Sequence, residues 1–175
     1  MAFMVPLEGK GRFLAGSTNK KVLIRRFDRE QLSGFVNPLT YLTDKGVELL
    51  NLHGSVAVIP YSDIKSVHFV REFEPMRQVE QQAFLTRPKL DGLWVRMRFR
   101  DEDLLEGVLP NNLLQLEHFG FTVTPPDYTY NNQRMFIPKA ALKEIQVLGV
   151  VGSPLRLPRR KSKDKPPPDQ IKLFE

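Results

Sequence analysis

The chain has 175 residues, of which 41% are hydrophobic, and its formal net charge is +6 at pH 7. This length suffices for one ordinary domain or two very small ones, and the hydrophobic content allows a buried core, which excludes wholesale disorder. The absence of cysteine excludes disulfides, thiolate zinc sites and cysteine nucleophiles, while His53, His68 and His118 are too scattered to favour a metal site or a catalytic triad. We therefore expect a non-enzymatic protein without a metal or other cofactor.

Hydropathy and charge also bear on location and partners. No apolar run reaches the roughly 18 residues that a membrane-spanning helix needs, and the first residues lack the apolar stretch of a signal peptide. We therefore expect a soluble, cytoplasmic protein that does not contact a membrane. The positive charge is concentrated in residues 151–175, where seven Lys/Arg face three Asp/Glu. Residues 20–150 are nearly neutral, so the total charge alone does not predict a nucleic-acid-binding surface on the folded part.

An internal repeat is the strongest organisational signal in the sequence. Residues 22–38 read VLIRRFDREQLSGFVNP, and residues 95–111 answer them with VRMRFRDEDLLEGVLPN. Further along, the pattern I-P-x-x-x-[IL]-K-x-[VI] begins at Ile59 and again at Ile137. Two matches in the same order predict a tandem duplication.

Each repeat has the pattern of a small β-barrel. Residues 22–27 alternate with a period of two, which places one set of side chains inward. The polar breaks that begin at Asp28 and Asp101 suit hairpin turns. Gly34 and Gly107 lie inside the next strand, where a missing side chain permits the bend that curls a short sheet. A strand that ends at the I-P pair, one helical turn and a closing strand complete about five strands in roughly 55 residues.

The sequence thus predicts a mainly β fold made of two tandem five-stranded barrels that pack together as one rigid body. A short helix over residues 75–85 is expected to connect them, because proline suits a first helical position. The segments, in order, are a flexible N-terminal segment (1–19), the first barrel (20–72), a linker (73–91), the second barrel (92–150) and a disordered, basic, proline-rich tail (151–175).

The charged hairpin, bending glycine, V-x-I-P strand end and helical turn resemble, in this order, the Sm-like or Src-homology-3-like small barrel. The resemblance extends over about 105 residues and implies a fold that many unrelated functions share. For Sm-like proteins, RNA is the implied partner.

A row of arginines is the first candidate site on the body. Its members are expected on the outward face of the two matching first strands: Arg25, Arg96, Arg98 and Arg100. Guanidinium groups bind phosphate oxygens through paired hydrogen bonds, so this row predicts a nucleic-acid contact. The alternative is a solvated strand face on which the arginines pair with neighbouring carboxylates.

A tyrosine-containing loop is the second candidate. Tyr128 and Tyr130 lie beside two asparagines in residues 124–132, and exposed rings with amides stack on and recognise bases. The alternative is a rigid hairpin tip, stiffened by Pro125 and Pro126.

A short peptide near the end of the sequence carries the sharpest functional signal. Residues 170–174 read QIKLF and resemble the bacterial sliding-clamp-binding motif, Q-[LI]-x-L-F, at every fixed position. The resemblance implies that Gln170 is a polar anchor, that Ile171 is a supporting contact, and that Leu173 and Phe174 fill an apolar pocket and contribute most of the binding energy. The alternative is a strand that folds back onto a barrel edge.

Two functional hypotheses follow. In the first, the protein is a non-enzymatic bacterial adaptor that its tail recruits to the DNA sliding clamp during DNA replication or repair. In the second, it is an RNA-binding regulator that uses the Sm-like body. The lysines and arginines of the tail fit contact with DNA or a purely solubilising role. An enzyme is disfavoured because the sequence has no evident nucleophile–base pair, metal cluster or phosphate-binding glycine loop.

Overall fold

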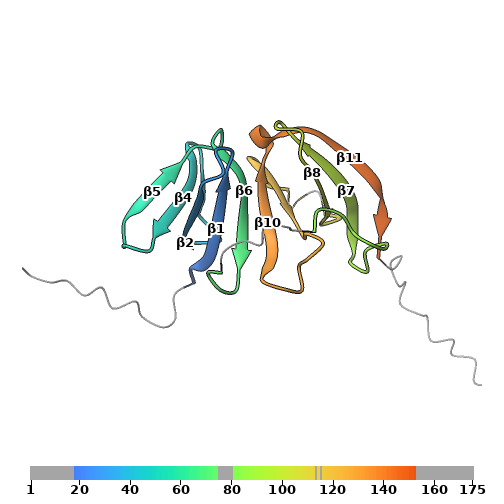
Figure 1. Cartoon of the computed structure of the whole chain (residues 1–175), viewed down its shortest axis with the longest axis horizontal. Coiled ribbons are helices and arrows are strands. Elements are labelled where there is room, and N and C mark those ends of the chain that lie inside the picture. The colour runs from blue at the N-terminus through green and yellow to red at the C-terminus, as the bar shows by residue number, and fades with distance from the viewer. Residues whose placement is uncertain (1–17, 75–80, 113, 115, 153–175) are drawn as a thin grey trace, which may run out of the picture.

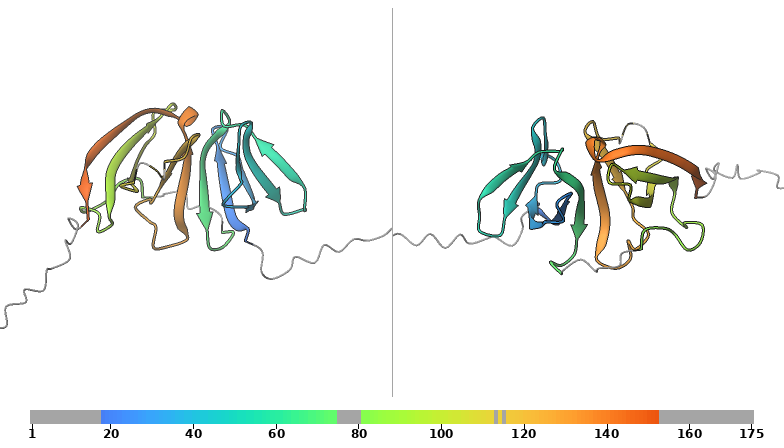
Figure 2. Two further views of the ribbon diagram at one scale, coloured as in Figure 1. Left: turned by 180° about the vertical axis from the view of Figure 1, so that it is seen from behind. Right: turned by 45° about the horizontal axis from the view of Figure 1, so that its top comes forward.

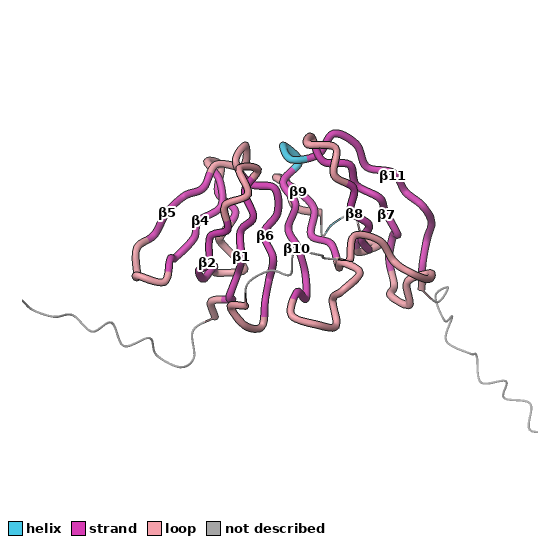
Figure 3. The backbone as a smooth tube through the Cα atoms, viewed as in Figure 1, coloured by secondary structure: helices cyan, strands magenta, loops and turns pink. Residues whose placement is uncertain are grey.

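The computed structural model describes residues 18–74, 81–112, 114 and 116–152, which form curled antiparallel sheets (Figure 1). The strands are β1 (Lys20–Arg26), β2 (Gln31–Val36), β3 (Leu42–Thr43), β4 (Gly46–Asn51), β5 (Val56–Ile59), β6 (Ile64–Val70), β7 (Gly92–Phe99), β8 (Leu104–Leu109), β9 (Gly120–Val123), β10 (Asn132–Pro138) and β11 (Leu142–Val151). These residues contain no α-helix, and the 3-10 helix η2 (Lys139–Ala141) is the helical turn drawn in Figure 3. The prediction of a mainly β fold is confirmed.

Both repeats pair their strands in the same order. In the first unit the order is β6, β1, β2, β4, β5, and in the second it is β11, β7, β8, with β9 and β10 following through one isolated bridge. The registers also correspond, since Val67 lies opposite Ile24 and the equivalent Ile145 lies opposite Met97. The duplication seen in the sequence is therefore a duplication of strand pairing.

The first hairpin of each unit has the same backbone. Arg29 has a φ of 70° and Glu102 a φ of 68°, a left-handed conformation that non-glycine residues seldom adopt. Each hairpin closes with an equivalent backbone hydrogen bond of 2.9 Å. The predicted turns at Asp28 and Asp101 are confirmed in position and share one conformation.

The two units are joined by direct strand pairing. The last strand of the first unit, β6, pairs with β10 of the second, so one sheet of eight strands continues across the boundary (Figure 2). A second sheet contains β11, β7 and β8. Among the described residues, β5 does not pair with β6 and β10 does not pair with β11. The prediction was two tandem five-stranded barrels packed on each other, whereas the strand pairing gives one sheet that runs through both units and a second sheet of three strands.

The hydrophobic cores are shared in the same way. Val22, Ile24 and Val67 are fully buried in the first core, and Phe136 of β10 packs among them. Phe27 of the first unit packs in return against the core of the second. Each core is therefore completed by a side chain from the other unit, which supports the expectation of one rigid body.

The two glycines predicted to bend strands lie within strands, each close to a neighbouring segment. Gly34 is within β2, and a side chain there would overlap the carbonyl oxygen of Leu50. Gly107 is within β8, where an added Cβ would lie 3.2 Å from Val123. Both glycines thus allow the next strand to cross closely over the first hairpin.

The predicted connecting helix is wrong over residues 81–85, which are irregular, and residues 75–80 lie outside the described part. This segment is held by β8 instead. The Glu106 N–H donates to the Gln82 carbonyl at 2.7 Å, and the Phe84 N–H donates to the Glu106 carboxylate at 3.1 Å. Because their hydrogen bonds go to a strand, these residues do not form the local bonds of a helix. Residues 1–17 and 153–175, including the predicted tail, also lie outside the described part.

Candidate functional site

Arg96 and Arg98 lie together on β7 and line one open groove. Arg96 binds the buried carboxylate of Glu106 at 2.8 Å, and Trp94 donates its indole N–H to the same carboxylate at 3.1 Å. Burial would raise the pKa of Glu106, but hydrogen bonds from Arg96, the Phe84 N–H and Trp94 lower it below its usual range. Arg96 therefore balances the buried negative charge of Glu106, which lies directly opposite it on β8.

Arg98 has two acidic partners. It forms an ion pair with Glu144 of β11, and its guanidinium lies 3.7 Å from Glu102. Lys143 also pairs with Glu102. The groove is thus lined by two arginines and two glutamates, and these ion pairs match the alternative of a paired strand face more closely than a phosphate site.

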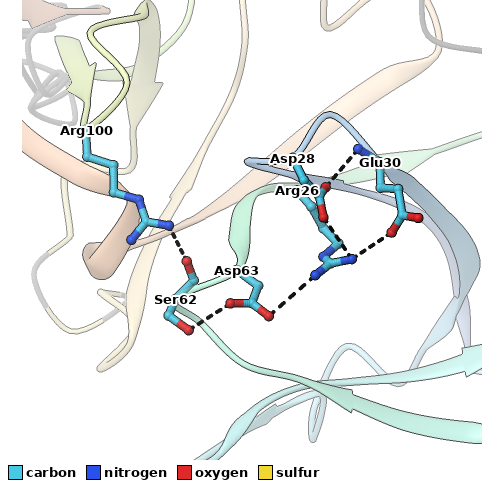
Figure 4. A network of polar contacts seen from close by, with 6 residues as sticks. All are labelled: Arg26, Asp28, Glu30, Ser62, Asp63 and Arg100. Carbon is cyan, nitrogen blue, oxygen red and sulfur yellow. Dashed lines mark hydrogen bonds and ion pairs between the residues drawn. The ribbon is translucent and has the colours of Figure 1, made fainter.

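Arg100 links the two units (Figure 4). Its guanidinium carbon lies 3.9 Å from the centre of the Phe27 ring, and it donates a hydrogen bond to the Ser62 carbonyl. From Ser62 the contacts continue through Asp63, whose carboxylate lies 3.6 Å from the Arg26 guanidinium. Arg100 of the second unit therefore holds the turn before β6 in the first.

Lys65 makes a second link between the units. Its ammonium, with only 11% of the side chain exposed, binds Asp101 at 2.6 Å and also pairs with Asp103. Burial would raise the pKa of Asp101, but the hydrogen bond and charge of Lys65 lower it below its usual range. This ion pair and the Arg100 contact fix the β7–β8 hairpin on the first unit.

Arg25 lies on β1 of the first unit, whereas the other three arginines belong to the second unit. It borders a small cleft at the junction together with Lys65 and Ser66. The structure thus brings Arg96 and Arg98 into one groove, whereas Arg25 and Arg100 are placed at the junction between the units.

The loop that carries Tyr128 and Tyr130 is a set of turns between β9 and β10. The Tyr130 ring is 49% exposed, and its hydroxyl lies 3.3 Å from Glu74. Asn131 anchors the loop by accepting hydrogen bonds from the Arg71 and Glu72 N–H groups, each at 2.9 Å. The tyrosines are held in place at one end of the junction and remain candidates for ring stacking.

A buried polar cluster at the junction escaped the sequence analysis. The Ser66 hydroxyl lies 2.8 Å from Nε2 of His68, and the Asn132 amide lies 2.9 Å from Nδ1 of the same ring. Burial, with a smaller contribution from Arg25, lowers the pKa of His68 to about 3. This contact between a hydroxyl and an imidazole was not expected from the sequence. Ser66 is only 2% exposed and His68 is fully buried, and the cluster joins β6 of one unit to Asn132 of β10 in the other.

Within the described residues, no group of three or more histidine or acidic side chains is arranged to hold a metal ion. The same part of the chain has no helix that is long and apolar enough to cross a membrane. The peptide that contains Gln170, Ile171, Leu173 and Phe174 lies outside the described residues.

The described residues thus define a class of mainly β protein in which two repeated units are joined by strand pairing, ion pairs and shared cores. Residues 18–149 match the family of unknown function DUF6982, and the chain belongs to this family. The match spans both units and their junction. No curated protein and no solved structure matches the chain.

Proposed function

We propose that the protein is a non-enzymatic adaptor whose peptide at residues 170–174 docks on the bacterial DNA sliding clamp, and that the folded body, a tandem small-barrel scaffold, serves in DNA replication or repair. The observation that carries the proposal is the Q-I-K-L-F sequence itself. It follows a stretch rich in proline, lysine and arginine, whose composition suits an extended tether.

The body supports this role indirectly. The charged side chains of its candidate groove are paired with one another, and Arg100 and Lys65 hold the units together. A rigid, nearly neutral body attached to a separate docking peptide suits a protein that brings two partners together. Because few side chains supply most of the energy of such contacts, the binding of a short peptide is sensitive to single substitutions.

Binding of the full-length chain to a purified bacterial sliding clamp, followed by calorimetry, tests the proposal. Leu173→Ala and Phe174→Ala are each expected to weaken binding by about 30-fold, as for a side chain worth about 2 kcal/mol. Lys172→Ala occupies the variable position of the motif and is the matched control, with affinity unchanged. No measurable binding by the unaltered chain, or equal losses at all three positions, would refute the proposal.

The alternative function is RNA binding by the body. The exposed Tyr130 ring supports it, whereas the carboxylate partners of Arg96 and Arg98 reduce the positive charge available to phosphates. A steep fall of RNA affinity with salt, together with weaker binding by Tyr130→Ala, would favour this function over clamp docking. Absence of RNA binding at low salt would dismiss it.

A further inference from the structure

Two strands at opposite ends of the body each have one unpaired edge. Among the described residues, β5 pairs only with β4 and β11 pairs only with β7 (Figure 1). Free edges bind other strands, and proteins usually protect them with charges or proline within the strand. β5 reads VAVI and carries no charge, and Val56 and Val58 are 62% and 47% exposed. On β11, Val147 is 59% exposed.

The junction inside the chain shows how such edges pair. β10 is the fourth principal strand of its unit, and it pairs antiparallel with β6, the last strand of the other unit. Its register places Arg134 opposite Phe69, Met135 opposite His68 and Phe136 opposite Val67. β5 is the repeat equivalent of β10, and β11 is the equivalent of β6. The two free edges are therefore the same two edges that meet at the junction.

Burial agrees with this equivalence. His68 and Phe69 on β6 are 0% and 6% exposed, whereas the equivalent Gln146 and Val147 on β11 are exposed. Phe136 on β10 is fully buried, whereas the equivalent Val58 on β5 is 47% exposed. Residues of β6 and β10 that are buried at the junction thus have equivalents on β11 and β5 that are exposed to solvent.

The charges are repeated too. Across the junction, Lys65 binds Asp101 and Asp103 of the next unit's hairpin. Lys143 is the equivalent of Lys65 and is 54% exposed, and the equivalent hairpin carboxylates are Asp28 and Glu30, which are 49% and 64% exposed. A second molecule placed by the same relation would bring its Asp28 and Glu30 to Lys143 of the first.

We propose that copies of this chain associate head to tail, with β11 of one copy pairing antiparallel with β5 of the next. The junction register, carried over by the repeat, places Val147 opposite Val56, Gln146 opposite Ala57 and Ile145 opposite Val58. Because the two surfaces differ, the contact can add further copies until a ring closes. This association rests on the body alone and is independent of clamp docking.

Disulfide trapping tests the register, because the natural chain has no cysteine. Directly opposite residues have Cα atoms about 4.5–5.5 Å apart, within the range that a disulfide spans. Under mild oxidation, a mixture of full-length Val56→Cys and Val147→Cys chains is expected to form a mixed disulfide dimer, and neither variant alone is expected to do so. Val150→Cys is the matched control, since Val150 is 60% exposed on the same strand but out of register.

The control is expected to cross-link to Val56→Cys at least ten times more slowly. Efficient disulfide formation by Val56→Cys chains alone would mean that two β5 edges pair with each other, which overturns the proposal. Equal cross-linking at Val147 and Val150 would also overturn it.

The native mass of the full-length chain, measured by light scattering, provides a second test. It is expected to exceed that of one chain and to rise with concentration, and Val56→Lys or Val147→Lys is expected to weaken association at least tenfold. Leu39→Lys is the control, because Leu39 is 88% exposed in a loop outside both edges. A native mass equal to that of a single chain at concentrations up to about 100 μM would overturn the proposal. That result is expected if residues 153–175 of the same chain cover the free edge of β5 or β11.

Discussion

The first hairpins of the two units have the same backbone but different surroundings. In the second unit, Asp101 and Asp103 bind Lys65 across the junction. In the first unit, the equivalent carboxylates of Asp28 and Glu30 bind Arg26 of their own hairpin. The comparison shows that the repeat preserves the local turn and the position of the carboxylates, while the neighbouring unit decides which positive charge they pair with.

The largest expected difference between equivalent positions is in the cores. Phe136→Ala removes a fully buried ring that completes the core of the other unit, and we expect a loss of about 3–5 kcal/mol in the free energy of unfolding. Val58→Ala removes a side chain that is 47% exposed, and we expect a loss below about 1 kcal/mol in the isolated chain. Urea denaturation of both variants at low protein concentration measures the difference, and similar losses would contradict it.

The two equivalent lysines provide the next comparison. Lys65→Met removes the partner of two carboxylates at a largely buried site, and we expect a loss of about 1–2 kcal/mol. Lys143→Met removes an exposed ion pair with Glu102, for which about 0.5 kcal/mol or less is expected. Thermal unfolding at low and high salt distinguishes the two, and equal effects would mean that the junction ion pair is unimportant.

His68 predicts a specific pH dependence. Its pKa is about 3 in the folded chain and 6.5 in the absence of perturbation, so the unfolded chain binds more protons between these values. The contribution of His68 to the free energy of unfolding is therefore fully present above pH 6.5. It declines as the pH falls towards 3, by up to about 1.4 kcal/mol per pH unit. His68→Gln introduces the residue found at the equivalent Gln146, and denaturation between pH 4 and pH 8 is expected to show a weaker slope for this variant. An unchanged slope would assign the pH dependence to other groups.

The shared turn conformation provides the last comparison. Arg29→Gly relieves a positive φ and is expected to stabilise the chain by up to about 1 kcal/mol. Glu102→Gly relieves the same strain but loses the ion pair with Lys143, so its gain is expected to be smaller. Denaturation curves of the two variants measure both effects, and a loss of stability in Arg29→Gly would show that the turn is not strained.

Local patterns predicted local structure well. The two hairpins follow from neighbouring residues and lie where the sequence places them. The alternation expected over residues 22–27 does not hold, because Val22, Leu23 and Ile24 are all buried. The pairing of Arg96 with Glu106 could also have been predicted, because the hairpin at Asp101 sets these residues opposite each other. A strand face that carries an arginine and a glutamate in register indicates an ion pair before it indicates a phosphate site.

The junction could not be predicted in the same way. β6 and β11 share the pattern of the repeat. The residues around them do not indicate which of the two will pair with a further strand. In retrospect, IKSVHFV has fewer charges than LKEIQVL, which is typical of a strand buried on both faces. The Ser66, His68 and Asn132 cluster depends on that pairing, and Asn132 lies 64 positions after His68 in the chain.

The pairing of β6 with β10 also has a consequence for synthesis of the chain. The first unit cannot complete its core until Phe136 has left the ribosome, long after residue 72 has emerged. During this interval the outer edge of β6 is open to other nascent chains, which is a recognised hazard for strands that form distant contacts. We therefore expect the first half to remain only partly folded on the ribosome, and both halves to reach their final structure in one late step.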